Sequence, residues 1–340
     1  MTFVTNYDYR NEYLKCIGCN LCTKNCPLRF SMNTVIMLYK ENRKEEMYKY
    51  IFDNHPFPLI CSYICPDHFC MDHCPNKVDI KIWRKILLFQ KERPKENIIK
   101  NGKHIAIVGG GVSGLTCAWY LYRKGYKITL YEENALGGEL NFIPESRLPK
   151  DILKYELDDL QKYVDDLILD TFNEEYINKY DKVIYCIGMK PRELNLKTDG
   201  SFPLTPYNEF LSYPSEEDVG IIGGGNIALD CALHNKGHST IFVRRNQWDM
   251  RINKKDFNTI IDKKISIVDN FIPLEIKYDT LFGEYYGNIV EFKFDKIITA
   301  IGRDPKELHY LSIKEIQIIP DKSAIETIAS TIKQLKDLKL

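Results

Sequence analysis

The cysteines of this 340-residue chain restrict its fold more than any other feature, because most of them fall in two short blocks near the amino terminus. The first block is Cys16-x2-Cys19-x2-Cys22-x3-Cys26-Pro27, and the second is Cys61-x3-Cys65-Pro66-x3-Cys70-x3-Cys74-Pro75. The first block has the spacing and the terminal proline of a bacterial iron–sulfur run. A segment built this way folds around an inorganic redox group, and such a group moves single electrons.

Zinc is the structural alternative for the same cysteines. Zinc sites favour well-separated C-x2-C pairs, whereas the order C-x2-C-x2-C-x3-C-P favours clusters. The nearby His55, His68 and His73 are expected at the surface rather than among the ligands, because the thiolates already suffice. The sequence therefore predicts that the two blocks bind iron through Cys16, Cys19, Cys22, Cys26, Cys61, Cys65, Cys70 and Cys74.

The charge balance gives no sign of a nucleic-acid partner, because Lys+Arg and Asp+Glu each total 47. Residues 1–100 carry 16 Lys+Arg against 11 Asp+Glu, an excess that either offsets the charge of thiolate-bound clusters or is ordinary surface scatter. No apolar run reaches the roughly 18–20 residues of a membrane span, and the first residues lack a hydrophobic signal core. We therefore expect a cytoplasmic protein, whose reduced thiols bind metal rather than form disulfides.

Two glycine-rich strand–helix–strand units form the only internal repeat in the sequence. The first is predicted as a strand at His104–Val108, the loop Gly109-Gly110-Gly111-Val112-Ser113-Gly114, a helix at Leu115–Lys124 and a strand at Lys127–Tyr131. The second is predicted as a strand at Val219–Ile222, the loop Gly223-Gly224-Gly225-Asn226-Ile227-Ala228, a helix to Lys236 and a strand at Ser239–Val243. Each copy has the strand-to-helix context that a dinucleotide-binding fingerprint requires.

The glycines of this fingerprint have separate tasks. The first permits a tight turn, the second lets the backbone approach a pyrophosphate at the helix N-terminus, and the third lets helix and strand pack closely. These places are taken by Gly109, Gly111 and Gly114 in the first unit and by Gly223, Gly225 and Ala228 in the second. A glycine-rich turn without a ligand is the alternative for each copy.

The residues after the second strand distinguish the two units chemically. Glu132 follows the strand in the first unit, where a carboxylate accepts hydrogen bonds from ribose hydroxyls and repels a 2′-phosphate. In the second unit the corresponding residues are Arg244 and Arg245, with Arg251 one loop further on, and guanidinium groups pair with a 2′-phosphate. The first site therefore suits FAD and the second NADPH, unless the arginines are only solvated surface charges.

Other segments are predicted from their apolar pattern. Residues 32–52 and 80–90 are expected to be helical, followed by a hydrophilic linker over 91–103. Strands at 182–187 and 297–301 each end at a glycine and could run beneath a dinucleotide or simply be buried. Cys117, Cys186 and Cys231 are expected to be buried structural thiols. The lack of a C-x-x-C pair beyond the cysteine blocks argues against a thioredoxin-reductase-like role.

Motifs in a fixed order carry a family resemblance. They are the two cysteine blocks, VGGGVSGL, YEENALGGEL, IPESRLPK, GGGNIALDCA, FVRR with a following Arg251, and TAIGRDP. Over about residues 10–310 the chain resembles the flavin- and iron–sulfur-containing NADPH oxidoreductases typified by the small subunit of bacterial glutamate synthase. The N-terminal part of dihydropyrimidine dehydrogenase and the large subunit of NADH-dependent ferredoxin:NADP oxidoreductase are similar.

The resemblance implies an α/β fold in which an α-helical iron–sulfur domain precedes two Rossmann-like domains. A helical domain with two 4Fe–4S clusters is expected at 1–100. A split FAD domain with a truncated C-terminal part is expected at 101–212 and 303–340, and an inserted NAD(P)H domain at 213–302. In this family hydride passes from nicotinamide to flavin, and single electrons leave through the clusters to a partner reductase or synthase subunit or to ferredoxin. No catalytic acid or base is needed.

The resemblance also assigns roles to individual residues. Those implied for FAD are Gly109, Gly111, Val112, Ser113 and Gly114 at the pyrophosphate, Glu132 at the ribose, and the turn Gly137-Gly138-Glu139-Leu140 with Arg147 near the flavin. Those implied for NADPH are Gly223, Gly224, Gly225, Asn226, Ile227, Arg244, Arg245, Arg251, Ala300, Ile301 and Gly302. The implied cluster pairing interleaves the blocks: Cys16, Cys19 and Cys22 with Cys74, and Cys26, Cys65 and Cys70 with a Gln or Glu.

Two departures from the family stand out. The position of that Gln or Glu aligns with Arg84, a poor iron ligand, so either Cys61 serves instead or the second cluster is incomplete or differently built. The family's late strand ending in Gly-Asp is missing, because no glycine follows Gly302, and Asp321 is only a weak substitute. FAD is then held less tightly or a partner completes the site. The alternatives are a non-catalytic electron-wiring or assembly subunit with impaired FAD binding, and reverse, ferredoxin-dependent reduction of NADP.

Overall fold

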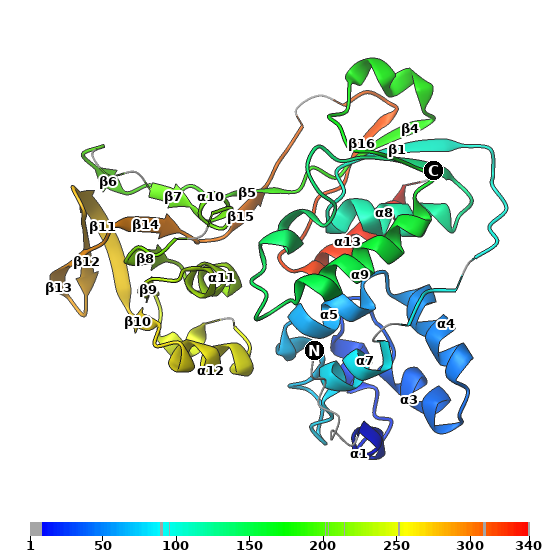
Figure 1. Ribbon diagram of the computed structural model, residues 1–340, viewed down its shortest axis with the longest axis horizontal. Coiled ribbons are helices and arrows are strands. Elements are labelled where there is room, and N and C mark those ends of the chain that lie inside the picture. Colours follow the sequence, from blue (N-terminus) through cyan, green and yellow to red (C-terminus); the bar gives the residue numbers. More distant parts are fainter. Residues whose placement is uncertain are drawn as a thin grey trace. The chain divides into compact units, whose positions relative to one another are not determined.

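The chain folds into two compact units (Figure 1). The computed structural model describes residues 9–88, 91–94, 96–200, 202, 204–213, 215–250, 252–308 and 311–338. The first unit comprises Met1–Asn141, Arg147–Gly188 and Lys306–Leu340, and the second comprises Phe142–Ser146 and Met189–Pro305. The cysteine blocks and the first glycine-rich loop belong to the first unit, and the second glycine-rich loop belongs to the second.

Short helices form the N-terminal part of the first unit. They are α1 (Tyr9–Leu14), α2 (Leu21–Asn25), α3 (Met32–Lys40), α4 (Lys44–Asn54), α5 (Pro58–Ile64), α6 (Asp67–Cys70) and α7 (Ile80–Leu88). The predicted single helix over 32–52 is wrong, because the chain breaks between α3 and α4. Asn42 adopts the left-handed conformation (φ 58°), and Arg43 N–H donates to the Leu38 carbonyl. This is the Schellman arrangement that ends a helix.

A five-stranded parallel sheet forms the rest of the first unit, in the order β16-β4-β1-β2-β3. Its strands are β1 (His104–Val108), β2 (Lys127–Tyr131), β3 (Asp166–Ile168), β4 (Lys182–Tyr185) and β16 (Glu315–Gln317). Helices α8 (Val112–Tyr122) and α13 (Ala324–Asp337) pack side by side, and α9 (Lys150–Leu160) contacts α5 (Figure 1). The central strands are buried apolar runs, as parallel strands covered by helices require.

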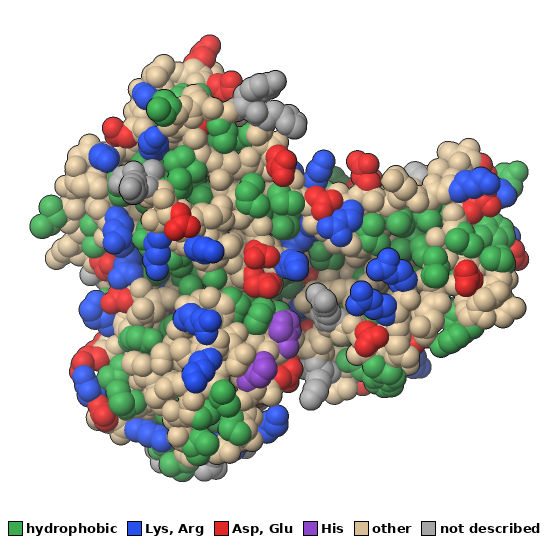
Figure 2. Space-filling model, turned by 180° about the vertical axis from the view of Figure 1, so that it is seen from behind, with side chains coloured by type: hydrophobic (Ala, Val, Ile, Leu, Met, Phe, Trp, Pro, Cys, Tyr) green, Lys and Arg blue, Asp and Glu red, His purple; other side chains and the backbone are tan. Residues whose placement is uncertain are grey.

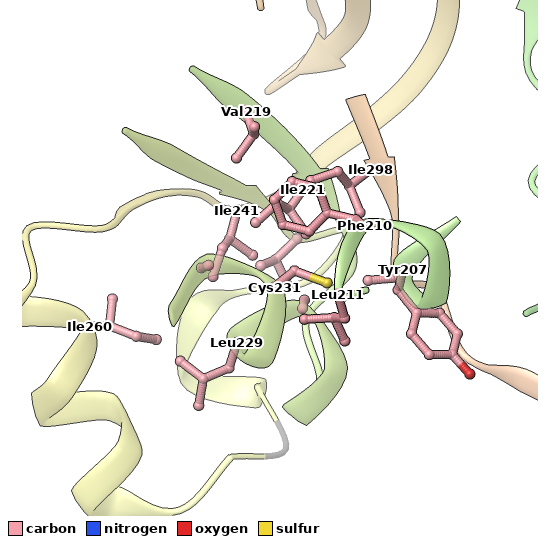
Figure 3. Close-up of a cluster of buried hydrophobic side chains, with 14 of the residues drawn as sticks. Tyr207, Phe210, Leu211, Val219, Ile221, Leu229, Cys231, Ile241, Ile260 and Ile298 are labelled. Atoms are coloured by element: carbon pink, nitrogen blue, oxygen red, sulfur yellow. The ribbon is translucent and has the colours of Figure 1, made fainter. Parts of the chain in front are cut away.

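The second unit has its own parallel sheet, in the order β10-β9-β8-β14-β7. Its strands are β7 (Leu204–Pro206), β8 (Val219–Ile222), β9 (Ser239–Phe242), β10 (Ser266–Val268) and β14 (Lys296–Thr299). Side chains of β8, β9, β14 and helix α11 (Asn226–His234) form its core, in which the Cys231 thiol is enclosed (Figure 3). A second sheet of order β13-β12-β11-β6 is made by β6 (Lys197–Thr198), β11 (Phe271–Lys277), β12 (Thr280–Tyr285) and β13 (Asn288–Lys293).

The predicted α/β class is confirmed, together with both strand–helix–strand units. The predicted bounds of β1, β2 and β8 match the structure, whereas α8 begins at Val112, three residues before the predicted start. The predicted domain boundaries stay a prediction. The longer segment of the second compact unit runs from Met189 to Pro305, in which β7 is an edge of the sheet and β5 (Met189–Pro191) pairs with β15 (Arg303–Pro305).

The surface mixes both signs of charge. Figure 2 shows basic and acidic side chains interspersed over the visible face, together with hydrophobic ones, rather than one field of a single sign. Among the residues that the structure describes, no helix has the length and apolar character needed to cross a bilayer.

The end of α3 yields a test of the fold. For residues other than Gly, Asn and Asp, the left-handed backbone conformation raises the free energy of the folded state by about 1–2 kcal/mol. We expect Asn42→Val to lower the free energy of unfolding by roughly that amount, whereas Asn42→Gly keeps it. Thermal unfolding of the two variants measures the difference, and equal melting temperatures would contradict the assigned helix end.

Candidate functional site

The first glycine-rich loop connects β1 to α8 and is shaped by close backbone contacts. Gly109 has φ 105°, and a β-carbon there would overlap the Cys186 carbonyl oxygen at the end of β4. Gly114 has equally little room, since a β-carbon would overlap the Gly109 carbonyl oxygen. Gly111 differs, because the nearest atom to a β-carbon there is the Gly138 Cα at 3.9 Å. The second glycine therefore presents open backbone, as contact with a pyrophosphate requires.

The helix that follows this loop begins without a side-chain cap. Gly111 is the N-cap residue of α8, and no side chain accepts from its first turn. Val112 and Ser113 form that turn, and Ser113 is buried. Free N–H groups at a helix N-terminus bind anions, helped by the helix dipole. The loop thus fits the phosphates of a dinucleotide.

Glu132 lies at the edge of the same loop. Its carboxylate accepts from Gly110 N–H (2.7 Å) and from Asn134 N–H (2.9 Å), which holds it at the end of β2. The turn at 137–138 packs against the loop, since Gly137 N–H donates to the Gly110 carbonyl (2.9 Å). Beyond that turn Leu140 is buried, whereas Glu139 and Arg147 are half-buried. The structure thus joins Glu132 and the 137–138 turn to the first loop.

The second glycine-rich loop, in the other unit, repeats this geometry. Gly223 has φ 146°, and a β-carbon there would overlap the Ala300 carbonyl oxygen at the end of β14. Gly224 packs on Val243, whereas no atom lies within 4 Å of a β-carbon on Gly225. Gly225 is the N-cap residue of α11, again without a side-chain cap. Asn226 and Ile227 start the helix, so the same phosphate-binding features recur.

The structure describes two of the three arginines expected beside this loop. Arg244 and Arg245 are exposed directly after β9, and Arg251 lies outside the described residues. Ile301 and Gly302 follow β14, and Gly302 (φ 119°) lies close to the Arg192 guanidinium. Arg192 pairs with Asp304 (2.7 Å). Sequence analysis missed Arg192, because its place depends on the pairing of β5 with β15, two strands far apart in the chain.

Every cysteine is a free thiol. Several of the eight cysteines in the two blocks are electrostatic neighbours, and we describe them as an outer and an inner group, with Cys22 of the outer group also close to Cys70 of the inner one. In the outer group, burial raises the pKa of Cys22, and the nearby Cys16 and Cys19 raise it further. The second block is tied to the first block two residues after Cys74, where Asn76 Nδ2 donates to the Lys15 carbonyl next to Cys16 (2.7 Å). Cys16, Cys19, Cys22 and Cys74 are therefore the candidate thiols of the outer group.

The inner group consists of Cys26, Cys61, Cys65 and Cys70. Burial raises the pKa of Cys65 to about 12, and the neighbouring Cys70 and Cys26 contribute in the same direction. Burial also raises the pKa of Cys61, which adjoins Cys65 and Cys26. Such thiols become good ligands only when a cation replaces their protons, which is what binding to iron does. The inner group therefore contains four thiols, among them Cys61, whose chemistry is compatible with binding to iron.

Arg84 of α7 lies against the inner group. It is 7% exposed, and its Nη2 donates to the Pro58 carbonyl. Its guanidinium lies 5.6 Å from the Phe30 ring, and its Nε has no hydrogen-bond partner among the described residues. Against the larger effect of burial, its charge lowers the pKa of Cys61, Cys65 and Cys70. Arg84 therefore offers a positive charge beside these thiols.

Glu156 of α9 fixes the helix that carries Cys61. Its carboxylate accepts from Leu59 N–H (2.9 Å) and Ile60 N–H (2.5 Å) at the start of α5. Burial raises the pKa of Glu156 to about 7, and the neighbouring Arg93 opposes that shift. Arg93 also pairs with Asp159 (2.5 Å). No sequence signal identified this cluster, because 97 residues separate Leu59 from Glu156.

The histidines and the remaining cysteines complete the inventory. His68 and His73 are exposed as predicted, but the prediction for His55 is wrong, because its ring is buried and accepts from Phe57 N–H. The predicted burial of Cys117, Cys186 and Cys231 is confirmed. In the part of the chain that the structure describes, no three His, Cys, Asp or Glu side chains converge on a point for a single metal ion.

Two family models match parts of the first unit. Residues 2–84 match the family model for dihydropyrimidine dehydrogenase domain II, 4Fe-4S cluster, and residues 104–139 match the model for FAD dependent oxidoreductase. The chain is thus similar to a 4Fe–4S domain in its N-terminal part and to FAD-dependent oxidoreductases around its first glycine-rich loop. The predicted resemblance is thereby confirmed.

Individual relatives agree with this class. The chain is 26% identical to the NADPH-Fe(3+) oxidoreductase subunit beta of Geobacter sulfurreducens, covering 93% of this chain and 55% of the relative. It is 26% identical to the NAD-dependent dihydropyrimidine dehydrogenase subunit PreT of Escherichia coli (86% and 79% covered) and 22% identical to the glutamate synthase [NADPH] small chain of that species (77% and 65%). The chain therefore spans little more than half of the Geobacter protein.

Solved structures show the same fold at lower identity. The 6-hydroxypseudooxynicotine amine oxidase of Pseudomonas geniculata superposes with a TM-score of 0.59 at 15% identity, over 88% of this chain and 50% of that one. A 2-naphthoyl-CoA reductase complex superposes with a TM-score of 0.58 at 19% identity, over 69% and 40%. These similarities concern the fold alone.

The inner group gives a prediction for one ligand. If Cys61 binds iron, Cys61→Ala removes one of two clusters, so about half of the iron and sulfide is lost on anaerobic reconstitution. Cys231→Ala, which truncates an equally buried thiol in the other unit, should keep the full content. Iron and sulfide analysis with electron paramagnetic resonance measures both. Full cluster content in Cys61→Ala would exclude Cys61 as a ligand.

Proposed function

We propose that the chain is an electron-input oxidoreductase subunit that passes a hydride from NADPH to FAD and then single electrons through two 4Fe–4S clusters to a partner reductase, synthase or ferredoxin. The observation that carries this proposal is the presence in one chain of two uncapped glycine-rich loops and two groups of four cysteines. When bound, FAD converts a two-electron donor into a source of single electrons. The names of two relatives support NADPH as the electron donor and a role as one subunit of a larger enzyme.

The first loop supports binding of FAD through the chain's own groups. The open backbone at Gly111 and the first turn of α8 would hold the pyrophosphate. Glu132, already fixed by Gly110 N–H, would orient the adenosine ribose. The second loop would bind NADPH likewise, with Arg244 and Arg245 pairing with the 2′-phosphate. These residues bind and orient, and none is required to transfer a proton.

The cysteine groups support two clusters of different surroundings. Cys16, Cys19, Cys22 and Cys74 would hold the outer cluster, and Cys26, Cys61, Cys65 and Cys70 the inner one. In this assignment Arg84 is not a ligand. Its buried guanidinium instead offsets the negative charge of the inner cluster, which water cannot do there.

The decisive experiment uses the reconstituted chain under anaerobic conditions. Stoichiometric FAD should bleach on addition of NADPH, and a tetrazolium dye should then be reduced repeatedly. Dye reduction that stays absent after full loading with FAD, iron and sulfide would refute the proposal.

A second candidate is a non-catalytic wiring or assembly subunit with impaired FAD binding. It is favoured by the segment from β16 to α13, which contains no glycine and so lacks a Gly-Asp contact for FAD. Flavin content separates the two candidates, because one FAD per chain that bleaches with NADPH is incompatible with the second. Operation in reverse, from ferredoxin to NADP, uses the same groups and differs only in the measured direction.

The exposed arginines predict cofactor preference. Removing charge-assisted hydrogen bonds costs about 1.5–3 kcal/mol each, so Arg244→Ala with Arg245→Ala should raise KM for NADPH at least tenfold. KM for NADH should stay unchanged, because NADH has no 2′-phosphate. Lys293→Ala, an exposed charge elsewhere in the same unit, is the control. An equal rise for both cofactors would show that the arginines do not read the 2′-phosphate.

A further inference from the structure

The loop of the first cysteine block is exposed along most of its length. Residues 17–21 are all exposed, including the Cys19 ligand candidate, whereas Cys61 and Cys65 of the inner group are buried. The inner group is attached to the FAD-binding half of the unit through Glu156 and α5. Electrons that leave a flavin would therefore reach the inner group first and the solvent-facing group last.

Several large apolar side chains in and next to the loop at residues 17–21 are exposed to solvent. Leu14 is 63% exposed, Ile17 67%, Leu21 38% and Met37 45%. They come from α1, the loop, α2 and α3. Apolar groups gathered around one exposed feature mark an interaction site more often than isolated ones do.

Contacts between the elements place these side chains together. The rings of Tyr13 in α1 and Tyr39 in α3 lie 5.3 Å apart. A β-carbon on Gly18 would lie 3.4 Å from Asn33 Oδ1, and Met37 stands one turn after Asn33 on α3. Residues four apart share a helix face. Met37 therefore faces the loop that carries Cys19.

Lysines accompany the apolar side chains. Lys15 follows Leu14, Lys24 stands one turn after Leu21, and Lys40 one turn after Met37; all three are exposed. Lys15 pairs with Glu12, and Lys40 lies over the Tyr13 ring at 5.9 Å. Lys24 and Lys40 have no carboxylate partner among the described residues, and the adjacent Glu41 is paired with Arg43. The rim of the surface is therefore cationic.

We propose that this Cys19 surface, formed by Leu14, Ile17, Leu21 and Met37 with Lys15, Lys24 and Lys40, docks a small acidic protein that carries a one-electron group. The inference deepens the proposed function, on which it rests, by naming the exit surface and the partner's chemistry. Acidic side chains of the partner would pair with the lysines and guide encounter, while the apolar centre excludes water. Each NADPH oxidised to NADP⁺ and one proton supplies two electrons, so two partner molecules are reduced in turn.

The test measures binding separately from turnover. An acidic bacterial 4Fe–4S ferredoxin is titrated into the reconstituted protein by calorimetry, and dye reduction by NADPH is followed in parallel. Wild-type affinity should fall at least tenfold as ionic strength rises to about 0.3 M. Met37→Glu should weaken binding at least tenfold and leave iron content and dye reduction unchanged.

A matched control defines the specificity of that loss. Ile313 is 92% exposed and lies in the segment before β16, away from the cysteine blocks, so Ile313→Glu should bind ferredoxin like the wild type. Equal effects of both variants, binding that does not depend on salt, or no binding by the wild type would overturn the proposal. If Met37→Glu instead abolished self-association in light scattering and left ferredoxin binding intact, the occupant would be a second copy and the proposal would also fall. Loss of dye reduction in the wild type would refute the proposed function alone, because binding is read independently.

Discussion

The carboxylate of Glu156 is the interaction on which the geometry of the first unit depends. It belongs to α9 of the nucleotide-binding half, yet it accepts the first free N–H groups of α5, which carries Cys61 and leads to Cys65. A buried carboxylate is costly, and here backbone donors and Arg93 offset that cost. If the carboxylate were removed, the N–H groups of Leu59 and Ile60 would lose their acceptor, and the buried Arg93 guanidinium would lose one of its carboxylate partners. This side chain thus connects the helix that carries Cys61 to the half of the unit that contains the sheet.

The two glycine-rich loops share one backbone geometry. In both, a first glycine with positive φ passes beneath the carbonyl of a neighbouring strand, Cys186 in one unit and Ala300 in the other. In both, the second glycine faces open space and the helix begins uncapped. What differs is the end of the next strand, where Glu132 is held in place and Arg244 and Arg245 extend into solvent. The common geometry suits phosphates, and the variable end suits the ribose.

Sequence alone predicted what depends on local pattern. Strands such as His104–Val108 were predictable because a buried parallel strand is a continuous apolar run, here ended by glycines. The end of α3 was not, because the apolar spacing continues past Asn42 and only its backbone conformation breaks the helix. The burial of His55 and the roles of Arg93 and Glu156 depend on segments up to 97 residues apart, which no local pattern reveals. The glycine loops could thus be found in advance, whereas the contacts that orient the cysteines could not.

The unequal burial of the two cysteine groups also determines how easily oxygen would reach iron bound to each group. Iron held by Cys19 would meet dissolved dioxygen directly, whereas iron held by Cys61 and Cys65 would lie behind packed helices. Solvent access is one of the levers that control iron–sulfur chemistry. Aerobic damage would therefore begin at the outer group and disconnect the chain from its acceptor while the flavin half remained intact.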